Sequence, residues 1–260
     1  KDFSFSLAYA PLDFGARRFC EARVWSYFNK FTDNGKDYLP YIEGKTNTPM
    51  PLFVKPKHKL SVQDVKDMMR DHYEGTPLDI SNDFGAGPYK TPYRLSPLNF
   101  KVDGQEYFNE RPISTQQSGF VFVAQMRAHK PDLIGGVLWF GVDDANMAVF
   151  TPVYCCATKV PVCYTRVDGA DYITFSWNSA FWIFNWVSNM VYPRYDLMIG
   201  DVREAQKEME TTFNNAQEGI EEMAAKLLAK DKNAAVDFLT NYTNMTAQST
   251  FDTWKQLGTF

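Results

Sequence analysis

Asp71, His72 and Glu74 lie within the stretch MMRDHYEGTPLDI, residues 68–80, and all three can exchange protons. Imidazole and carboxyl groups are the usual general acids and bases near neutral pH. They follow a helical pattern, and the carbonyl groups at the end of a helix favour a nearby cation. A solvated surface turn would use the same residues, so two alternatives stay open. We treat the three residues as candidates for a substrate-binding site.

Two arginines and an aspartate pair extend the set of candidates. Arg111, in NERPISTQQSG, and Arg127, in VAQMR, flank predicted strands and could each hold a carboxylate through two hydrogen bonds. Ordinary surface ion pairs are the alternative for both. Asp143 and Asp144 follow WFGV and could form half of a glycosidase-type carboxylate pair. A turn at the end of a strand is favoured, because aspartate is common in turns.

Signatures of several other chemistries are missing from the sequence. It contains no GxSxG, HExxH or EF-hand pattern, and the glycine-containing loop at residues 82–93 lacks the features of a phosphate-binding P-loop. Zinc-ligand spacing and a CxxC pair are absent as well, so we expect no metal and no cofactor. We expect free thiols at all four cysteines, Cys20, Cys155, Cys156 and Cys163.

Charge and hydropathy exclude two classes of partner. The 260 residues include 27 basic and 31 acidic side chains, interspersed, with a net charge of −4, so nucleic acid is not expected to bind. The stretch from Phe175 to Tyr192 is uncharged, but Asn178, Asn185 and Asn189 fall on one helical stripe. Amides facing lipid are costly, so we predict a helix buried in protein and no membrane partner. The compartment, cytoplasmic or periplasmic, stays undecided.

Periodicity predicts mixed helix and sheet, an α+β chain. The first sixty residues combine aromatic runs with turn signals, which favours short strands and loops. Ser61 and Asp64 have the spacing of a capping box, which predicts a helix of about three turns ending near His72–Gly75. Asp103-Gly104 predicts a hairpin, and alternating patterns then predict strands in STQQSGFVFVAQMR, IGGVLWFGV and AVFTPVYC.

The C-terminal third is predicted to be helical. Asp201 and Glu204 have capping-box spacing, and apolar residues recur after them at intervals of three and four. A break near Asp231–Asn233 predicts a helical hairpin. We therefore expect a domain at residues 1–200 and a helical hairpin at residues 201–260, packed on that domain or extending from it.

Several long motifs resemble those of a known enzyme family, in the same order: FGARRFCEARVWS, RDHYEGTPLDIS, GAGPYKTPYR, NERPISTQQSGFVFVAQMR, KPDLIGGVLWFGVDD and FWIFNWVSN. Together they resemble the peptidase D-type dipeptidases, which are cysteine N-terminal nucleophile hydrolases. The resemblance runs from Phe3 to about Asp201. It implies a layered αββα sandwich, here incomplete, and hydrolysis of dipeptides by a cysteine at mature residue 1.

The chain departs from this pattern at its first residue, which is Lys1. In the family mechanism the thiol attacks while the free α-amino group of the same residue, with an ordinary pKa near ~8, acts as the base. An internal cysteine such as Cys20 or Cys155 has no α-amine. We therefore expect the nucleophile upstream of Lys1, no catalytic residue in this chain, and no activity of the chain alone. Its expected partners are the N-terminal part of the same enzyme or, through exposed sheet edges, further copies of itself.

The resemblance implies a dipeptide as substrate, which presents a carboxylate and an amino group. We predict that Arg111 receives the carboxylate and that Asp71 or Glu74 receives the amino group. His72 could activate a thiol, although no spacing brings it to one. Two alternatives remain open: a related amidase acting on another amide, and a noncatalytic binding or assembly domain.

Overall fold

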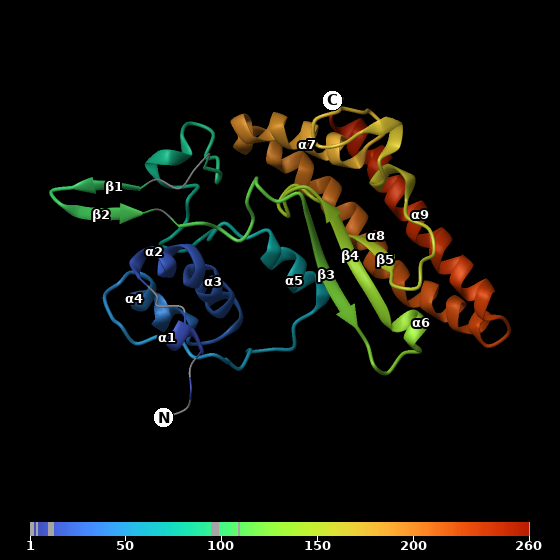
Figure 1. Cartoon of the computed structure of the whole chain (residues 1–260), viewed down its shortest axis with the longest axis horizontal. Coiled ribbons are helices and arrows are strands. Elements are labelled where there is room, and N and C mark those ends of the chain that lie inside the picture. Colours follow the sequence, from blue (N-terminus) through green and yellow to red (C-terminus); the bar gives the residue numbers. More distant parts are fainter. Residues whose placement is uncertain (1–2, 4, 10–12, 95–98, 109, 260) are drawn as a thin grey trace. The chain divides into compact units, whose positions relative to one another are not determined.

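A computed structural model describes the chain from residue 3 to residue 259, apart from residues 4, 10–12, 95–98 and 109 (Figure 1). The chain divides into two compact units, Lys1–Thr115 (unit 1) and Gln116–Phe260 (unit 2). Helices and two small antiparallel sheets occur together, which confirms the α+β class. The C-terminal helices belong to the same unit as the larger sheet.

Unit 1 begins with helices, so the prediction of short strands in the first sixty residues is wrong. The main helix is α3, Ala22–Phe31, preceded by a π-helical turn at Arg17–Glu21. The aromatic residues of this segment suggested strands, but their spacing places Trp25 and Ala22 on one buried helical face. Shorter helices accompany it: α1 Phe5–Tyr9, α2 Phe14–Ala16, and α4 Leu39–Ile42.

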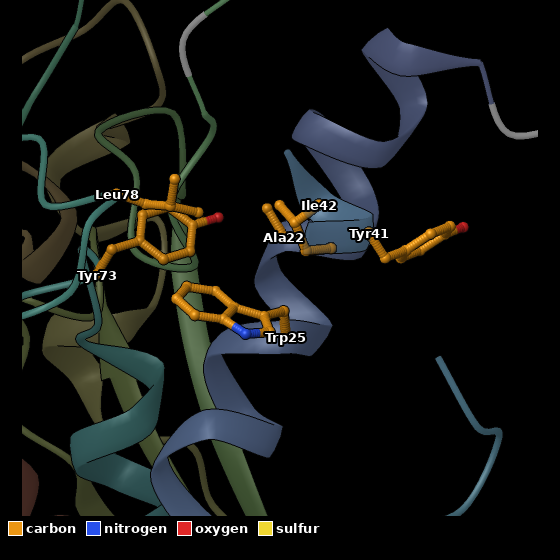
Figure 2. Packing of buried hydrophobic residues seen from close by; sticks show 6 residues of the cluster. All are labelled: Ala22, Trp25, Tyr41, Ile42, Tyr73 and Leu78. Atoms are coloured by element: carbon orange, nitrogen blue, oxygen red, sulfur yellow. The ribbon is translucent and has the colours of Figure 1, made fainter. Parts of the chain in front are cut away.

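The core of unit 1 joins these helices to the loop that carries the candidate residues. Figure 2 shows the cluster, whose members are all buried: Ala22, Trp25, Tyr41, Ile42, Tyr73 and Leu78. Trp25 also donates a 3.1 Å hydrogen bond from Nε1 to the carbonyl oxygen of Gly35, so its polar atom is satisfied. Truncating such a buried tryptophan to alanine typically costs about 3–5 kcal/mol. The loop is therefore held by the buried side chains of Tyr73 and Leu78, which pack in this cluster.

The predicted hairpin of unit 1 and the predicted start of its helix are confirmed, but the helix ends at Met69 and not near His72–Gly75 as predicted. Helix α5 covers Val62–Met69 and begins with a complete capping box between Ser61 and Asp64. Strands β1, Asn99–Val102, and β2, Gln105–Phe108, pair antiparallel around Asp103 and Gly104. Both turn residues have positive φ, 50° and 79°, as a two-residue hairpin of this kind requires.

Unit 2 contains the three longer predicted strands, which are also confirmed. They are β3 Phe120–Met126, β4 Gly136–Val142 and β5 Thr151–Tyr154, and they form one antiparallel sheet in the order β3-β4-β5. The short helix α6, Asp132–Gly135, lies between β3 and β4. Phe122 pairs with Phe140 across the sheet, and Leu138 pairs with Val153.

Three helices follow the sheet: α7 Ala180–Val191, α8 Tyr195–Leu228 and α9 Lys232–Leu257. Helix α8 begins at Tyr195, so the predicted start at Asp201 is wrong. Pro193 falls in the preceding turn, where a missing N–H costs nothing, and the helix therefore continues upstream of Asp201. The break is confirmed, because Asp231 caps α9 by accepting a 2.8 Å hydrogen bond from the Asn233 amide. None of the described helices has a stretch long and apolar enough to cross a membrane.

Helices α8 and α9 run along one face of the β3-β4-β5 sheet (Figure 1). Val123, Trp139 and Tyr154 of the sheet are buried on this face. Gln125 accepts hydrogen bonds from Trp139 Nε1 at 3.1 Å and from Gln217 of α8 at 2.9 Å. The covered face thus combines buried apolar side chains with a hydrogen bond that links the sheet to α8.

Candidate functional site

The loop after α5 has an unusual backbone conformation, which sets the directions of its side chains. Tyr73 has a φ of 65° although it is neither glycine nor asparagine, and Gly75 has a φ of 73°. A non-glycine residue in the left-handed region costs on the order of 1–3 kcal/mol, and such residues concentrate at functional sites. Tyr73 is fully buried in the core of unit 1, and this packing holds the loop in its strained form.

Asp71 is a buried, hydrogen-bonded carboxylate. Its Oδ2 atom accepts a 2.6 Å hydrogen bond from the Ser26 hydroxyl and a 3.2 Å hydrogen bond from the Tyr73 amide. Burial raises the pKa of Asp71, and the hydrogen bond from Ser26 opposes that rise. These contacts make Asp71 a support for the loop and leave it badly placed to receive a substrate ammonium.

His72 and Glu74 form a pair of which one member is buried and the other accessible. The Glu74 carboxylate lies 3.2 Å from His72 Nδ1 and accepts a 2.7 Å hydrogen bond from the His72 amide. Burial alone would raise the pKa of Glu74, but the hydrogen bonds and charge of His72 lower it to about 2. Glu74 is therefore ionised at neutral pH, and 48% of its side chain is exposed.

The ring of His72 is fixed from both sides. It is completely buried and meets the Tyr93 ring edge to face, with centroids 5.0 Å apart. Within the described residues its Nε2 atom is buried without a hydrogen-bond partner. His72 therefore orients Glu74, while its second nitrogen contacts no cysteine.

The structure brings the segment around Arg111 to this loop. Tyr73 donates a 2.8 Å hydrogen bond from its hydroxyl to the carbonyl oxygen of Arg111, and the Ser114 amide donates to the carbonyl oxygen of Asp71 at 3.2 Å. Arg111 is exposed. It lies between β2, which ends at Phe108, and β3, which starts at Phe120. Arg111, predicted to bind the substrate carboxylate, and Asp71 and Glu74, predicted to bind its amino group, thus lie on backbone segments that are hydrogen-bonded to each other.

An ion pair that the sequence did not reveal stands beside Arg111. Arg18, in the π-helical turn, pairs with Glu110, and both side chains are largely buried. Burial lowers the pKa of Arg18, while the nearby Glu43 carboxylate opposes the change. Single-turn π-bulges occur frequently at functional sites, but no local pattern predicted one here. The two partners are far apart in the chain, so no spacing rule would have joined them.

The remaining charged candidates are structural residues of unit 2. Arg127 pairs with Glu221 at 2.6 Å and donates to the carbonyl oxygen of Ile134 at 3.1 Å, so its guanidinium is occupied. Asp143 follows β4 as predicted, but it is buried and accepts a hydrogen bond from Ser188. Burial raises the pKa of Asp143 to about 6. The hydrogen bond from Ser188 opposes this rise, and the charge of the neighbouring Asp144 adds to it.

Two of the four cysteines are exposed, one is half-buried and one is buried. Cys20 is exposed, with a guanidinium nitrogen of Arg23 at 4.0 Å, and Cys155 is exposed as well. Burial raises the pKa of Cys156 and raises that of Cys163 to about 11. In the described part of the chain no histidine or carboxylate is hydrogen-bonded to any of these sulfur atoms.

Unit 2 also contains an open apolar cavity of about 420 Å³, within the size range of small-ligand sites. Phe120, Phe140, Val142 and Phe181 form much of its lining, and Arg166 and Asp171 contribute charged groups. Those two pair with each other at 3.1 Å. The cavity could hold an apolar side chain, but it contains none of the residues predicted for the site.

Comparison with known proteins places these motifs in a family. The chain is 26% identical to a probable dipeptidase B of Lactococcus lactis subsp. lactis over 209 residues, which cover 75% of this chain and 39% of that protein. It is 26% identical to a probable dipeptidase of Salmonella dublin over 153 residues, 59% of this chain and 30% of that protein. A probable dipeptidase of Latilactobacillus sakei is 25% identical over 149 residues, 57% of this chain and 27% of that protein.

The chain therefore spans well under half the length of these relatives. The model of peptidase family C69 matches residues 1–208, which include the loop at Asp71–Glu74, the segment at Arg111 and the whole sheet of unit 2. This agrees with the resemblance to dipeptidases that the sequence motifs indicated. The chain belongs to peptidase family C69.

Proposed function

We propose that this chain is the C-terminal portion of a dipeptidase that hydrolyses dipeptides through an N-terminal cysteine located upstream of Lys1. The family match over residues 1–208 carries the proposal. The curated relatives named above are probable dipeptidases, and the matched stretch is 39% or less of each. Most of such an enzyme would then lie outside the present sequence.

The surroundings of the cysteines support an external nucleophile. Attack on a peptide carbonyl needs a thiolate, and a thiol whose pKa is raised by burial, such as that of Cys163, supplies little of it. In the proposed reaction the N-terminal thiol adds to the carbonyl carbon, and the α-amine of the same residue takes the thiol proton. That proton then passes to the leaving amine, and water hydrolyses the acyl-enzyme.

Arg111 and Glu74 are the groups proposed to hold the two ends of the dipeptide. Arg111 is exposed and suited to bidentate hydrogen bonding of the substrate carboxylate. Glu74 is ionised and accessible, so we assign it the substrate ammonium in preference to Asp71, which is buried and already hydrogen-bonded. His72 acts as a positioning residue by holding Glu74.

In this proposal the sheet of unit 2 and the layer formed by α8 and α9 are two layers of an incomplete αββα sandwich. One face of the sheet is covered by these helices, as a layered architecture requires. The remaining layers would come from the polypeptide outside this chain.

The test is an assay of three samples against a panel of dipeptides: this chain alone, the polypeptide encoded upstream, and both produced as one protein. We expect hydrolysis by the continuous protein only, abolished by a thiol-alkylating reagent. N-acetylated dipeptides serve as the control substrates, because acetylation removes the ammonium that Glu74 is proposed to bind. Hydrolysis by the chain alone would overturn the external nucleophile. A preference for the acetylated substrates would favour the related amidase over the dipeptidase.

A further inference from the structure

The cavity of unit 2 has aromatic walls. It measures about 420 Å³ and is lined by the adjoining ends of β3 and β4 and by the segment from Cys163 to Phe181. Phe120 stacks on Phe140 with ring centroids 6.0 Å apart, and Phe140 meets Tyr164 at 5.5 Å. The Tyr164 hydroxyl lies 3.1 Å from Thr151 Oγ1 in β5, so the polar end of this ring is satisfied by the sheet. The cavity thus presents apolar ring surface to a ligand.

The segment that lies against this part of the sheet is held by its own hydrogen bonds. Asp168 accepts hydrogen bonds from the Ser176 hydroxyl at 2.9 Å and from the Asn178 side-chain amide at 2.8 Å. Trp182 of α7 donates a 2.9 Å hydrogen bond from Nε1 to the carbonyl oxygen of Asp171. These contacts tie the segment to itself and to α7. A cavity whose walls are already in place avoids most of the cost of ordering them when a ligand binds.

One positive and one negative side chain stand at this apolar cavity. Arg166 and Asp171 both line it and pair with each other at 3.1 Å. Asp171 is oriented by hydrogen bonds from the Ile173 and Thr174 amides to its Oδ1 atom, while Oδ2 accepts from Arg166. Among the described residues the Arg166 guanidinium makes no other hydrogen bond, and 73% of its side chain is exposed. Most of its N–H groups are therefore available to a ligand.

We infer that this cavity binds a free α-amino acid with an apolar side chain, such as phenylalanine or leucine. The apolar side chain packs against the rings of Phe120 and Phe140, and its removal from water drives binding. The α-carboxylate accepts paired hydrogen bonds from Arg166, and the α-ammonium lies against the Asp171 carboxylate. Opening the exposed pair for the ligand costs little, because exposed ion pairs contribute little to stability.

Charge complementarity selects this class of ligand. An amino acid carries a carboxylate and an ammonium next to each other, as the cavity carries a guanidinium and a carboxylate. An apolar acid or an apolar amine would complement only one of the two. The inference stands apart from the proposed function, because every group that it uses belongs to unit 2 and the chain alone can test it.

The experiment titrates the isotope-labelled chain with L-phenylalanine and follows the backbone amide signals of Gly119 and Phe120 by nuclear magnetic resonance. We expect phenylpropanoate, which lacks the ammonium, and phenethylamine, which lacks the carboxylate, to bind at least tenfold more weakly. L-Glutamine, a zwitterion with a polar side chain, should not bind. Equal affinities for phenylalanine and phenylpropanoate would overturn the assignment to an amino acid. So would cavity signals that stay unchanged up to the solubility limit of phenylalanine.

Matched variants separate the charged part of the site from the apolar part. Arg166→Ala should weaken phenylalanine binding at least tenfold without weakening that of phenethylamine, which has no carboxylate. Phe120→Ala should weaken both ligands. Phe122→Ala is its control and should change neither, because Phe122 is a half-exposed ring of the same strand that does not line the cavity.

Circular dichroism checks that each variant folds, and Arg166→Gln replaces Arg166→Ala if the latter does not. Wild-type affinity in the Arg166 variant, or equal effects of Phe120→Ala and Phe122→Ala, would refute the site.

The same titration in the continuous protein tests whether the cavity stays accessible there. We expect a similar dissociation constant, and loss of binding would show that further polypeptide occupies the cavity and would overturn the inference. The two proposals can fail separately. Dipeptide hydrolysis by a protein whose cavity binds no amino acid would refute only this inference. Amino-acid binding by a continuous protein that hydrolyses no dipeptide would refute only the proposed function.

Discussion

The hydroxyl of Tyr73 lies 2.8 Å from the carbonyl oxygen of Arg111 and donates a hydrogen bond to it. This contact joins the loop after α5 to the segment that precedes unit 2. Because Tyr73 is buried among Trp25 and Leu78, the core of unit 1 determines where the backbone of Arg111 lies. The buried cluster of unit 1 therefore helps to position Arg111, the residue proposed to bind the substrate carboxylate.

Tyr73→Phe should therefore destabilise the chain by about 1–2 kcal/mol, since the ring stays packed while the Arg111 carbonyl oxygen loses its donor. Urea denaturation followed by tryptophan fluorescence measures the change. Tyr172→Phe is the matched control, because Tyr172 is largely exposed, and it should change the free energy of unfolding very little. Equal effects of the two substitutions would contradict the role assigned to the hydrogen bond.

Arg111→Ala should raise the KM for dipeptides at least tenfold in the continuous protein, with a smaller change in kcat. Arg111→Lys should recover only part of the loss, because an ammonium cannot make the paired hydrogen bonds of a guanidinium. Arg194→Ala removes another exposed arginine and serves as the control. An unchanged KM in Arg111→Ala would remove this residue from the substrate site.

Glu74 predicts a dependence of stability on pH. Its pKa in the folded chain, about 2, lies below its ordinary value of 4.5, so the ionised form stabilises the fold above that ordinary value. The contribution should be lost as pH falls from 4.5 towards 2, where the folded state must also take up the proton. The difference in unfolding free energy between the wild type and Glu74→Gln should shrink over this interval. A constant difference from pH 6 to pH 2 would contradict the assignment.

The raised pKa of Asp143 predicts a pH dependence of stability with the opposite sign to that of Glu74. Its pKa is raised from 3.8 to about 6, so the fold is favoured below the ordinary value and loses stability as pH rises through the folded pKa. The shift corresponds to a loss on the order of 3 kcal/mol by pH 8. Asp143→Asn should remove this loss, so its stability relative to the wild type should improve between pH 4 and pH 8. A relative stability that stays constant over that range would contradict a buried, protonated Asp143.

Local signals predicted much of the fold. The capping box at Ser61, the Asp103-Gly104 hairpin and the break at Asp231 depend on neighbouring residues, so the sequence displays them directly. The start of α8 and the helices of the first sixty residues were mispredicted. For α8, the prediction placed the start at a capping-box pattern that lies inside the longer helix. For the first sixty residues, the abundance of aromatic residues favoured strands, although the spacing of the residues was helical.

The site was predictable only in its local part. Asp71, His72 and Glu74 are neighbours in the chain, and the contact between His72 and Glu74 follows from that closeness. The sequence could not show that Asp71 would be buried against Ser26, or that Arg18 would pair with Glu110. Such contacts depend on tertiary packing between distant segments, on which periodicity carries no information.

The central claim is that the attacking sulfur is not in this chain. The most direct measurement replaces all four cysteines at once, with Cys20→Ser, Cys155→Ser, Cys156→Ser and Cys163→Ala, in the continuous protein. Dipeptide hydrolysis is then followed with and without a thiol-alkylating reagent. The account predicts that the cysteine-free chain still supports hydrolysis within about threefold of the wild type and that alkylation abolishes it. Loss of hydrolysis in a correctly folded quadruple variant would place the nucleophile in this chain and contradict the account.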